Sequence, residues 1–126
     1  MILKDATPFF SFSTNLLNES KIFYEDILGL ETAIVEDRFL HVQLPYNQPL
    51  VIYYKVNHQP ASYTVLNFQV TGIQNIVNEM GNKGVVFEQY GPPIQTDEAG
   101  ISWDDEGSHI AWFKDPGGNI LALIEN

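Results

Sequence analysis

Cysteine is absent from the sequence, and lysine and arginine together number only six. A chain without cysteine has no disulfide, no thiolate nucleophile and no cysteine-ligated zinc. Long apolar runs are also missing, because no stretch approaches the roughly 20 residues that a membrane-spanning helix needs. The N-terminal residues lack the charged and then apolar pattern of a secretion signal. We therefore expect a cytoplasmic protein without a membrane partner.

The few basic residues are outnumbered by 16 aspartates and glutamates, which gives a formal net charge of -10. An acidic surface repels the phosphate groups of DNA and RNA, so we expect no nucleic-acid partner. The same charge would favour a cationic ligand, although acidity more often serves only solubility. Hydrophobic residues make up 44% of the 126 positions, which suits one globular domain with a real core.

Two segments carry the pattern of amphipathic helices. The first follows Thr14 and Asn15, either of which can cap its free amides, and it ends at Gly29. Its apolar residues are Leu17, Phe23, Tyr24, Ile27 and Leu28. The second follows Thr71, and its apolar residues recur at the helical spacing i, i+3, i+4 and i+7: Ile73, Ile76, Val77 and Met80.

The rest of the chain has the pattern of β-strands separated by turns, of which residues 115–118 form the tightest. The longest piece without a predicted strand is 91–107, and a loop of that length is usually a lid, a binding loop or an interface arm. We expect strands at 7–13, 32–36, 38–44, 50–56, 64–70, 85–90, 108–114 and 119–125.

The order strand, helix and three strands occurs twice. Residues 10–13 correspond to residues 68–71, and each of these segments leads directly into a helix. An offset of about half the chain length indicates a duplicated unit. We therefore predict an α+β fold of two modules, about 1–57 and 64–126, joined by a linker at 57–63. In each module the helix should cover one sheet face and leave the other open.

Two motifs strengthen this interpretation: FYEDILGL at 23–30 and FKDPGGNI at 113–120. They resemble the first-helix ending and the final hairpin of the vicinal oxygen chelate superfamily, which includes glyoxalases, bleomycin-resistance proteins and extradiol dioxygenases. Residues 84–90, Thr96, Gly100 and 111–116 are similar to one widespread branch of undefined function. The resemblance spans essentially the whole chain and implies two βαβββ modules whose open sheets curl into a cup.

In metal-using members of that superfamily, four side chains in the cup hold a divalent ion that acts as a Lewis acid. The resemblance places these four positions at Thr7, Val65, Ala122 and Tyr53, or Ile52 if the register shifts by one. Stable divalent sites need three or four histidine, cysteine or carboxylate donors. We therefore expect no metal ion and no other cofactor.

The three histidines do not suggest a replacement metal site, because they lie far apart in the sequence. His41 shares the more polar face of its strand and is assigned to the cup. His58 is expected to be exposed in the linker. His109 shares its alternation with Ala111 and Phe113, away from the cup.

Strand alternation also assigns the other residues of the cup. Phe10 and Phe12 should pack beneath the first helix, and Leu66 and Phe68 beneath the second. Apolar walls with a few converging polar groups are typical of a small-molecule pocket, and aromatic rings suit an aromatic or cationic ligand. The expected ligand-binding residues are Thr7, Phe9, Ser11, His41, Tyr53, Asn67, Gln69, Trp112 and Ala122.

The function predicted from these residues is the binding of a small aromatic or cationic molecule in a metal-free cup. One alternative is a lyase, isomerase or dioxygenase-type enzyme, either with relocated metal ligands or with metal-free acid–base catalysis by His41 or Glu88. Another is a structural or regulatory dimer whose own side chains fill the cup. No catalytic residue is assigned. We expect a homodimer, because two-module chains of this superfamily commonly pair and open sheet edges invite association.

Overall fold

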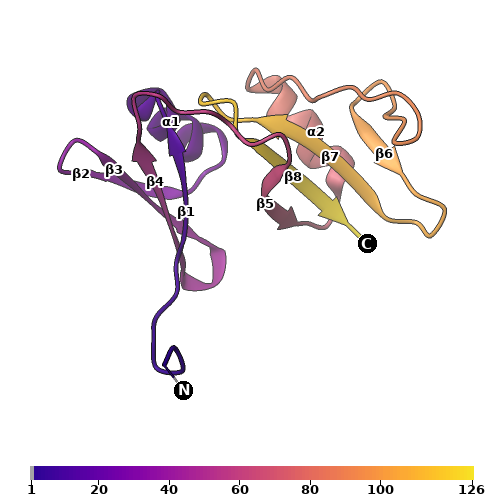
Figure 1. The fold of residues 1–126 in the computed structure, drawn as a ribbon. Coiled ribbons are helices and arrows are strands. Elements are labelled where there is room, and N and C mark those ends of the chain that lie inside the picture. Colours follow the sequence, from indigo (N-terminus) through magenta and orange to yellow (C-terminus); the bar gives the residue numbers. More distant parts are fainter. Residues whose placement is uncertain (1) are drawn as a thin grey trace. The chain divides into compact units, whose positions relative to one another are not determined.

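The computed structural model describes residues 2–126, and the chain divides into two compact units (Figure 1). The first unit ends at His58, and the second runs from Gln59 to Asn126. Each unit consists of one four-stranded sheet and the helical segment that follows its first strand. No helix among residues 2–126 is long and apolar enough to cross a membrane.

The first unit has the sheet order β1-β4-β3-β2. Strands β1 and β4 are parallel, and the other neighbouring pairs are antiparallel. Its elements are β1 (Phe10–Thr14), α1 (Leu17–Ile22), a π-helical segment (Phe23–Ile27), β2 (Glu31–Val35), β3 (Phe39–Leu44), a 3-10 turn (Pro45–Asn47) and β4 (Gln48–Tyr54).

Strand alternation builds the core of this unit. Leu40 pairs with Ile52 and Val42 pairs with Leu50, so all four side chains share one sheet face. They are almost completely buried, as is Tyr24 from the π-helical segment. Phe12 lies on the same face, as predicted, because it pairs with Ile52.

The start of α1 differs from the prediction. The helix begins at Leu17, and no side chain accepts a hydrogen bond from its first amides. The expected cap by Thr14 or Asn15 is therefore wrong. The Thr14 hydroxyl instead accepts a hydrogen bond from the Leu16 amide at 3.1 Å, and it lies 3.2 Å from the Ser20 hydroxyl. These groups fix the entry into the helix from inside the core, since Thr14 and Ser20 are both buried.

The second unit repeats the topology with the order β5-β8-β7-β6, in which β5 and β8 are parallel and the other pairs are antiparallel. Its elements are β5 (Thr64–Gln69), α2 (Ile73–Asn82), β6 (Ile101–Trp103), β7 (His109–Lys114) and β8 (Ile120–Glu125). The predicted apolar stripe of α2 is confirmed, because Ile73, Val77 and Met80 are buried. The α+β class and the two βαβββ modules are confirmed as well.

The second strand of the second unit along the chain lies elsewhere than predicted. Residues 85–90 form no strand, and β6 lies within the segment 91–107, which was expected to be unstructured. On the edge of β7 that faces away from β8, the first half pairs with β6, and the second half accepts a backbone bond from the Glu88 amide to the Trp112 carbonyl at 2.9 Å. Phe87 is nevertheless buried and packs edge-on against Phe113, with ring centroids 5.7 Å apart.

Side-chain hydrogen bonds order the loop between Gly91 and β6. The buried Thr96 hydroxyl accepts from the Tyr90 amide at 2.9 Å, and Asp97 accepts from the Ala99 and Ile101 amides, both at 2.9 Å. Partial burial tends to raise the pKa of Asp97, but these hydrogen bonds and one from Trp103 outweigh it, and the pKa falls below its usual range. This part of the predicted long loop is therefore internally cross-linked.

The first turn of α2 is capped by the carboxylate of Glu125, from the end of β8. Its two oxygens accept hydrogen bonds from the Gly72 amide at 2.7 Å and from the Ile73 amide at 3.0 Å. A negative charge at this helix end also interacts favourably with the helix dipole. The bonds from Ile73 and Gly72 hold the pKa of Glu125 below its ordinary value of 4.5.

We expect Glu125→Gln to lower the thermal midpoint of unfolding at neutral pH, because the neutral side chain offers one acceptor instead of a carboxylate. The depressed pKa of Glu125 means that its stabilisation is present above pH 4.5 and is lost as the pH falls through the folded-state value. Circular dichroism melts across a pH series should therefore show the two proteins converging in acid. A difference that stays constant down to strongly acidic pH would contradict this role.

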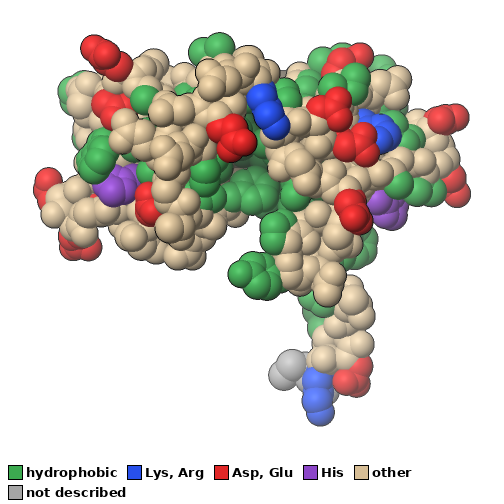
Figure 2. All heavy atoms as spheres, turned by 180° about the vertical axis from the view of Figure 1, so that it is seen from behind, with side chains coloured by type: hydrophobic (Ala, Val, Ile, Leu, Met, Phe, Trp, Pro, Cys, Tyr) green, Lys and Arg blue, Asp and Glu red, His purple; other side chains and the backbone are tan. Residues whose placement is uncertain are grey.

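Acidic side chains outnumber basic ones on the surface. Figure 2 shows aspartates and glutamates spread over the visible face and lysines or arginines at few places. Several large apolar residues are also exposed, among them Phe9 and Phe10 at about the start of β1. Phe10 is 57% exposed and does not pack beneath the helix, so that expectation is wrong.

Candidate ligand-binding faces

The open face of the first sheet collects several of the predicted site residues. In the register of β1 and β4, Ser11 pairs with Val51 and Ser13 with Tyr53. In the register of β3 and β4, His41 pairs with Val51. These side chains alternate with the buried Leu50 and Ile52, and they therefore lie on the opposite face of the sheet. Ser11, His41 and Tyr53 are thus brought to one surface.

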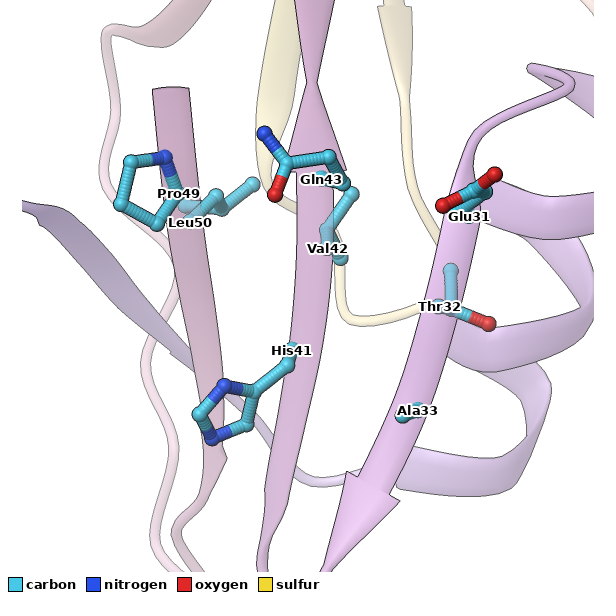
Figure 3. A pocket seen from close by; sticks show the side chains of 8 residues that line it. All are labelled: Glu31, Thr32, Ala33, His41, Val42, Gln43, Pro49 and Leu50. Carbon is cyan, nitrogen blue, oxygen red and sulfur yellow. The ribbon is translucent and has the colours of Figure 1, made fainter. Parts of the chain in front are cut away.

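A cavity of about 230 Å³ lies over β2, β3 and β4 (Figure 3). His41 and Gln43 contribute the polar groups of β3, and Ala33, the cross-strand neighbour of His41, leaves space because its side chain is small. Gln43 lies between Glu31 and Pro49 across the strands. The cavity is lined by Glu31, Thr32, Ala33, His41, Val42, Gln43, Pro49 and Leu50.

Thr7 and Phe9 are not brought to this sheet. Strand β1 starts at Phe10, so the predicted strand 7–13 is wrong for residues 7–9. Both side chains are exposed in the segment that precedes β1. The two adjacent apolar residues 9 and 10 do not show where β1 begins. The start of β1 is set by its pairing with β4, which lies about 40 positions later in the chain.

The open face of the second sheet holds the other predicted residues. Ala122 on β8 pairs with Asn67 on β5 and with Trp112 on β7. Gln69 follows on the same face, beside Ile124. Asn67 and Gln69 are exposed, whereas Ala122 is only 1% exposed. Asn67, Trp112 and Ala122 therefore form a continuous row across three strands.

Two side-chain contacts lie next to the row of Asn67, Trp112 and Ala122. The rings of Tyr90 and Trp112 meet edge-on, with their centroids 5.3 Å apart. The Lys114 ammonium forms an ion pair with the Glu88 carboxylate at 3.2 Å. Glu88 is thus already engaged by a cation, which weakens the hypothesis that it acts as a general base.

The donor chemistry does not fit a divalent ion at the positions implied by the resemblance. Val65 and Ala122 have no donor atom, Thr7 is outside the sheet, and Tyr53 offers one phenol. Val65 also lies where the register of β5 shifts. Within residues 2–126 there is no group of three or more histidines, cysteines, aspartates or glutamates that could hold a metal ion.

The sequence did not reveal a close pair formed by Ser13 and His58. The Ser13 hydroxyl and the His58 Nδ1 are 2.6 Å apart, although the residues are 45 positions apart in the chain. His58 is half-buried, so its expected exposure in the linker is wrong. A backbone bond from the Lys55 amide to the Thr14 carbonyl, at 2.9 Å, brings the end of the unit back to β1 and explains this proximity.

Solved structures with the same fold were found by comparison. A lactoylglutathione lyase from Agrobacterium tumefaciens superposes with a TM-score of 0.70 and 14% identity, over 97% of this chain and 94% of that one. A glyoxalase family protein from Enterococcus faecalis gives a TM-score of 0.69 and 22% identity, over 99% and 100%. The chain has the vicinal oxygen chelate fold.

A third structure with this fold is a member of the glyoxalase/bleomycin resistance protein/dioxygenase superfamily from Sphaerobacter thermophilus. Its TM-score is 0.69 at 21% identity, over 95% of this chain and 98% of that one. No family model matches the sequence, and no curated protein matches it. At such identities the likeness establishes the vicinal oxygen chelate fold and leaves the chemistry to the residues of this chain.

Proposed function

We propose that the protein binds a small aromatic or cationic organic molecule on the open faces of its sheets, without a metal ion. The cavity over β2, β3 and β4 is the observation that supports this proposal most directly. It combines an imidazole, an amide and a carboxylate with apolar walls, which is the usual make-up of a small-molecule site.

The charge and the aromatic content of these faces support the choice of ligand. Within the described part of the chain, Glu31 is the only aspartate, glutamate, lysine or arginine that lines the cavity, and the whole chain carries a formal charge of -10. A cation would therefore be attracted both locally and at long range. Tyr53 and Trp112 on the open faces offer ring surfaces to a cationic or aromatic ligand.

Calorimetric titration of EDTA-treated protein with a panel of aromatic amines tests this proposal. We expect binding without added metal, and we expect Glu31→Gln to weaken the binding of a cation about threefold, as for an exposed ion pair. Glu36→Gln is the matched control, because Glu36 is an exposed glutamate of the adjacent turn that does not line the cavity. His41→Ala should also weaken binding.

Two results would reject the proposal. One is a strict need for a divalent ion. The other is binding that Glu31→Gln, Glu36→Gln and His41→Ala leave equally unaffected. Acid–base catalysis by His41 remains a second candidate, favoured by its place in the cavity. In that case His41→Ala should abolish turnover of a substrate while part of the binding survives.

We also propose that the protein is a homodimer. The segment around the start of β1 exposes four large apolar side chains: Ile2 (97%), Leu3 (75%), Phe9 (60%) and Phe10 (57%). Exposed apolar surface of this kind, beside the edge strand β1, favours association.

Light scattering at micromolar concentration should give twice the mass of the chain. The combined change Leu3→Ser and Phe9→Ser should shift the protein toward the monomer, whereas Val56→Ser, which removes another exposed apolar side chain, should not. A clean monomer in the unaltered protein would refute the proposal.

A further inference from the structure

A second cavity, of about 440 Å³, lies beside the start of α2, on the helix side of the second sheet. Its walls come from the first turns of α2 and from the ends of β6, β7 and β8, which all belong to the second unit (Figure 1). The lining residues are Gly72, Ile73, Gln74, Asn75, Asn78, Trp103, His109 and Glu125.

Trp103 gives this cavity a fixed aromatic surface. Its indole is 57% exposed, yet the indole N–H donates a hydrogen bond to the Asp97 carboxylate at 3.2 Å. Trp103 also pairs with His109 between β6 and β7, and the two rings meet at a centroid distance of 3.9 Å and an angle of 73°. The hydrogen bond to Asp97 and the contact with His109 hold the exposed indole in one orientation. The ring is therefore preorganised for a ligand.

His109 brings an unused hydrogen-bonding atom to the cavity. Its Nδ1 is buried and has no hydrogen-bond partner among residues 2–126. In the tautomer with the proton on Nε2, Nδ1 is an acceptor, and a buried acceptor without a donor is costly. A ligand donor would satisfy Nδ1 once a rotation of the imidazole turns this atom toward the cavity.

The charges of the lining residues indicate which kind of hydrogen-bond donor a ligand would bring. Among residues 2–126, Glu125 is the only carboxylate that lines the cavity, and no lysine or arginine lines it. Its oxygens already occupy the free amides of Gly72 and Ile73, so the start of α2 has little left to offer an anion. Each carboxylate oxygen can still accept a further bond. The carboxamides of Gln74, Asn75 and Asn78 add further acceptors.

We propose that this cavity binds a small organic ammonium ion. Its N–H groups donate to the Glu125 carboxylate and, after rotation of the imidazole, to His109 Nδ1, and its apolar part lies against the Trp103 ring. An anion would meet Glu125 without a compensating basic group. A molecule without a donor would leave His109 Nδ1 unpaired. This site is separate from the proposed binding surface on the open faces.

Nuclear magnetic resonance can test the proposal at this site alone, because the chain has two tryptophans and hence two indole N–H signals. Trp103→Phe assigns them. We expect benzylammonium, titrated at neutral pH, to shift the Trp103 indole and the His109 ring signals. Trp103→Leu replaces an exposed side chain and should weaken the affinity about fivefold, as for the loss of a cation–π contact.

Three matched compounds separate the contributions. Benzyltrimethylammonium keeps the charge but has no N–H, so it should bind more weakly than benzylammonium and should be insensitive to His109→Phe. Benzyl alcohol and benzoate should leave the Trp103 signal in place. Equal shifts with benzoate or benzyl alcohol would overturn the proposal.

An unchanged Trp103 signal in all four titrations would overturn it as well. Shifts of the His41 and Trp112 signals alone would indicate binding on the open faces of the sheets instead of in this cavity. Failure here is therefore distinguishable from failure of the proposed function.

Discussion

Replacing Gly100 by alanine should lower the free energy of unfolding by about 3 kcal/mol or more. Gly100 has a φ of +91°, and a Cβ there would lie 2.6 Å from the Phe87 Cβ and 3.3 Å from the Glu88 carbonyl oxygen. Neither neighbour can yield easily, because Phe87 is buried against Phe113 and Glu88 is held by its amide to the Trp112 carbonyl. Urea denaturation followed by circular dichroism measures the loss.

Gly107→Ala is the matched control for this change. Gly107 has nearly the same φ, +90°, but a Cβ there would meet nothing within 4 Å. Its replacement should cost only the backbone strain, about 1 kcal/mol. If the two variants lost the same stability, steric contact with Phe87 would not be the reason for glycine at position 100.

Asp115→Ala should destabilise the protein by about 3 kcal/mol. The Asp115 carboxylate accepts hydrogen bonds from the Asn119 amide at 2.9 Å and from the Asn119 side chain at 3.1 Å. Both residues are buried, at 4% and 2% exposure, so water cannot replace the lost acceptor well. The turn between β7 and β8 depends on this pair, and thermal or urea unfolding measures the effect.

Asp104→Ala is a control with the same local chemistry on the surface. Asp104 also accepts two hydrogen bonds across a turn, from the Glu106 amide at 2.9 Å and the Ser108 amide at 2.8 Å, but it is exposed. Its loss should cost about 1 kcal/mol or less, since water can pair with the freed amides. A larger loss for Asp104→Ala than for Asp115→Ala would show that burial does not set the effect.

The regular parts of the fold could be predicted because they follow strict periods. The stripe of α2 has helical spacing, and the strands β3, β4 and β7 alternate between buried and less buried residues. The same alternation placed His41, Tyr53 and Trp112 on the sheet faces opposite the buried cores. An error of one residue in the strand register would have moved each of these side chains to the other face of its sheet.

The errors occurred where pairing across the sequence overrides the local pattern. Residues 85–90 alternate like a strand, yet Val86 is 82% exposed and only Glu88 bonds to β7. Strand β6 has three residues, which is too short for a period to be recognised. The contact of Ser13 with His58 and the cavity beside Trp103 and His109 both depend on packing between distant segments.

The order of strands in each sheet has a consequence for protein synthesis. In the sheets formed by residues 2–126, β1 pairs only with β4 and β5 pairs only with β8, so each unit's first strand stays unpaired until its last strand has been made. The first sheet can close once residue 54 has left the ribosome, and the second only after residue 125. A nascent chain therefore presents open strand edges over most of each unit's translation, when chaperones have most to bind.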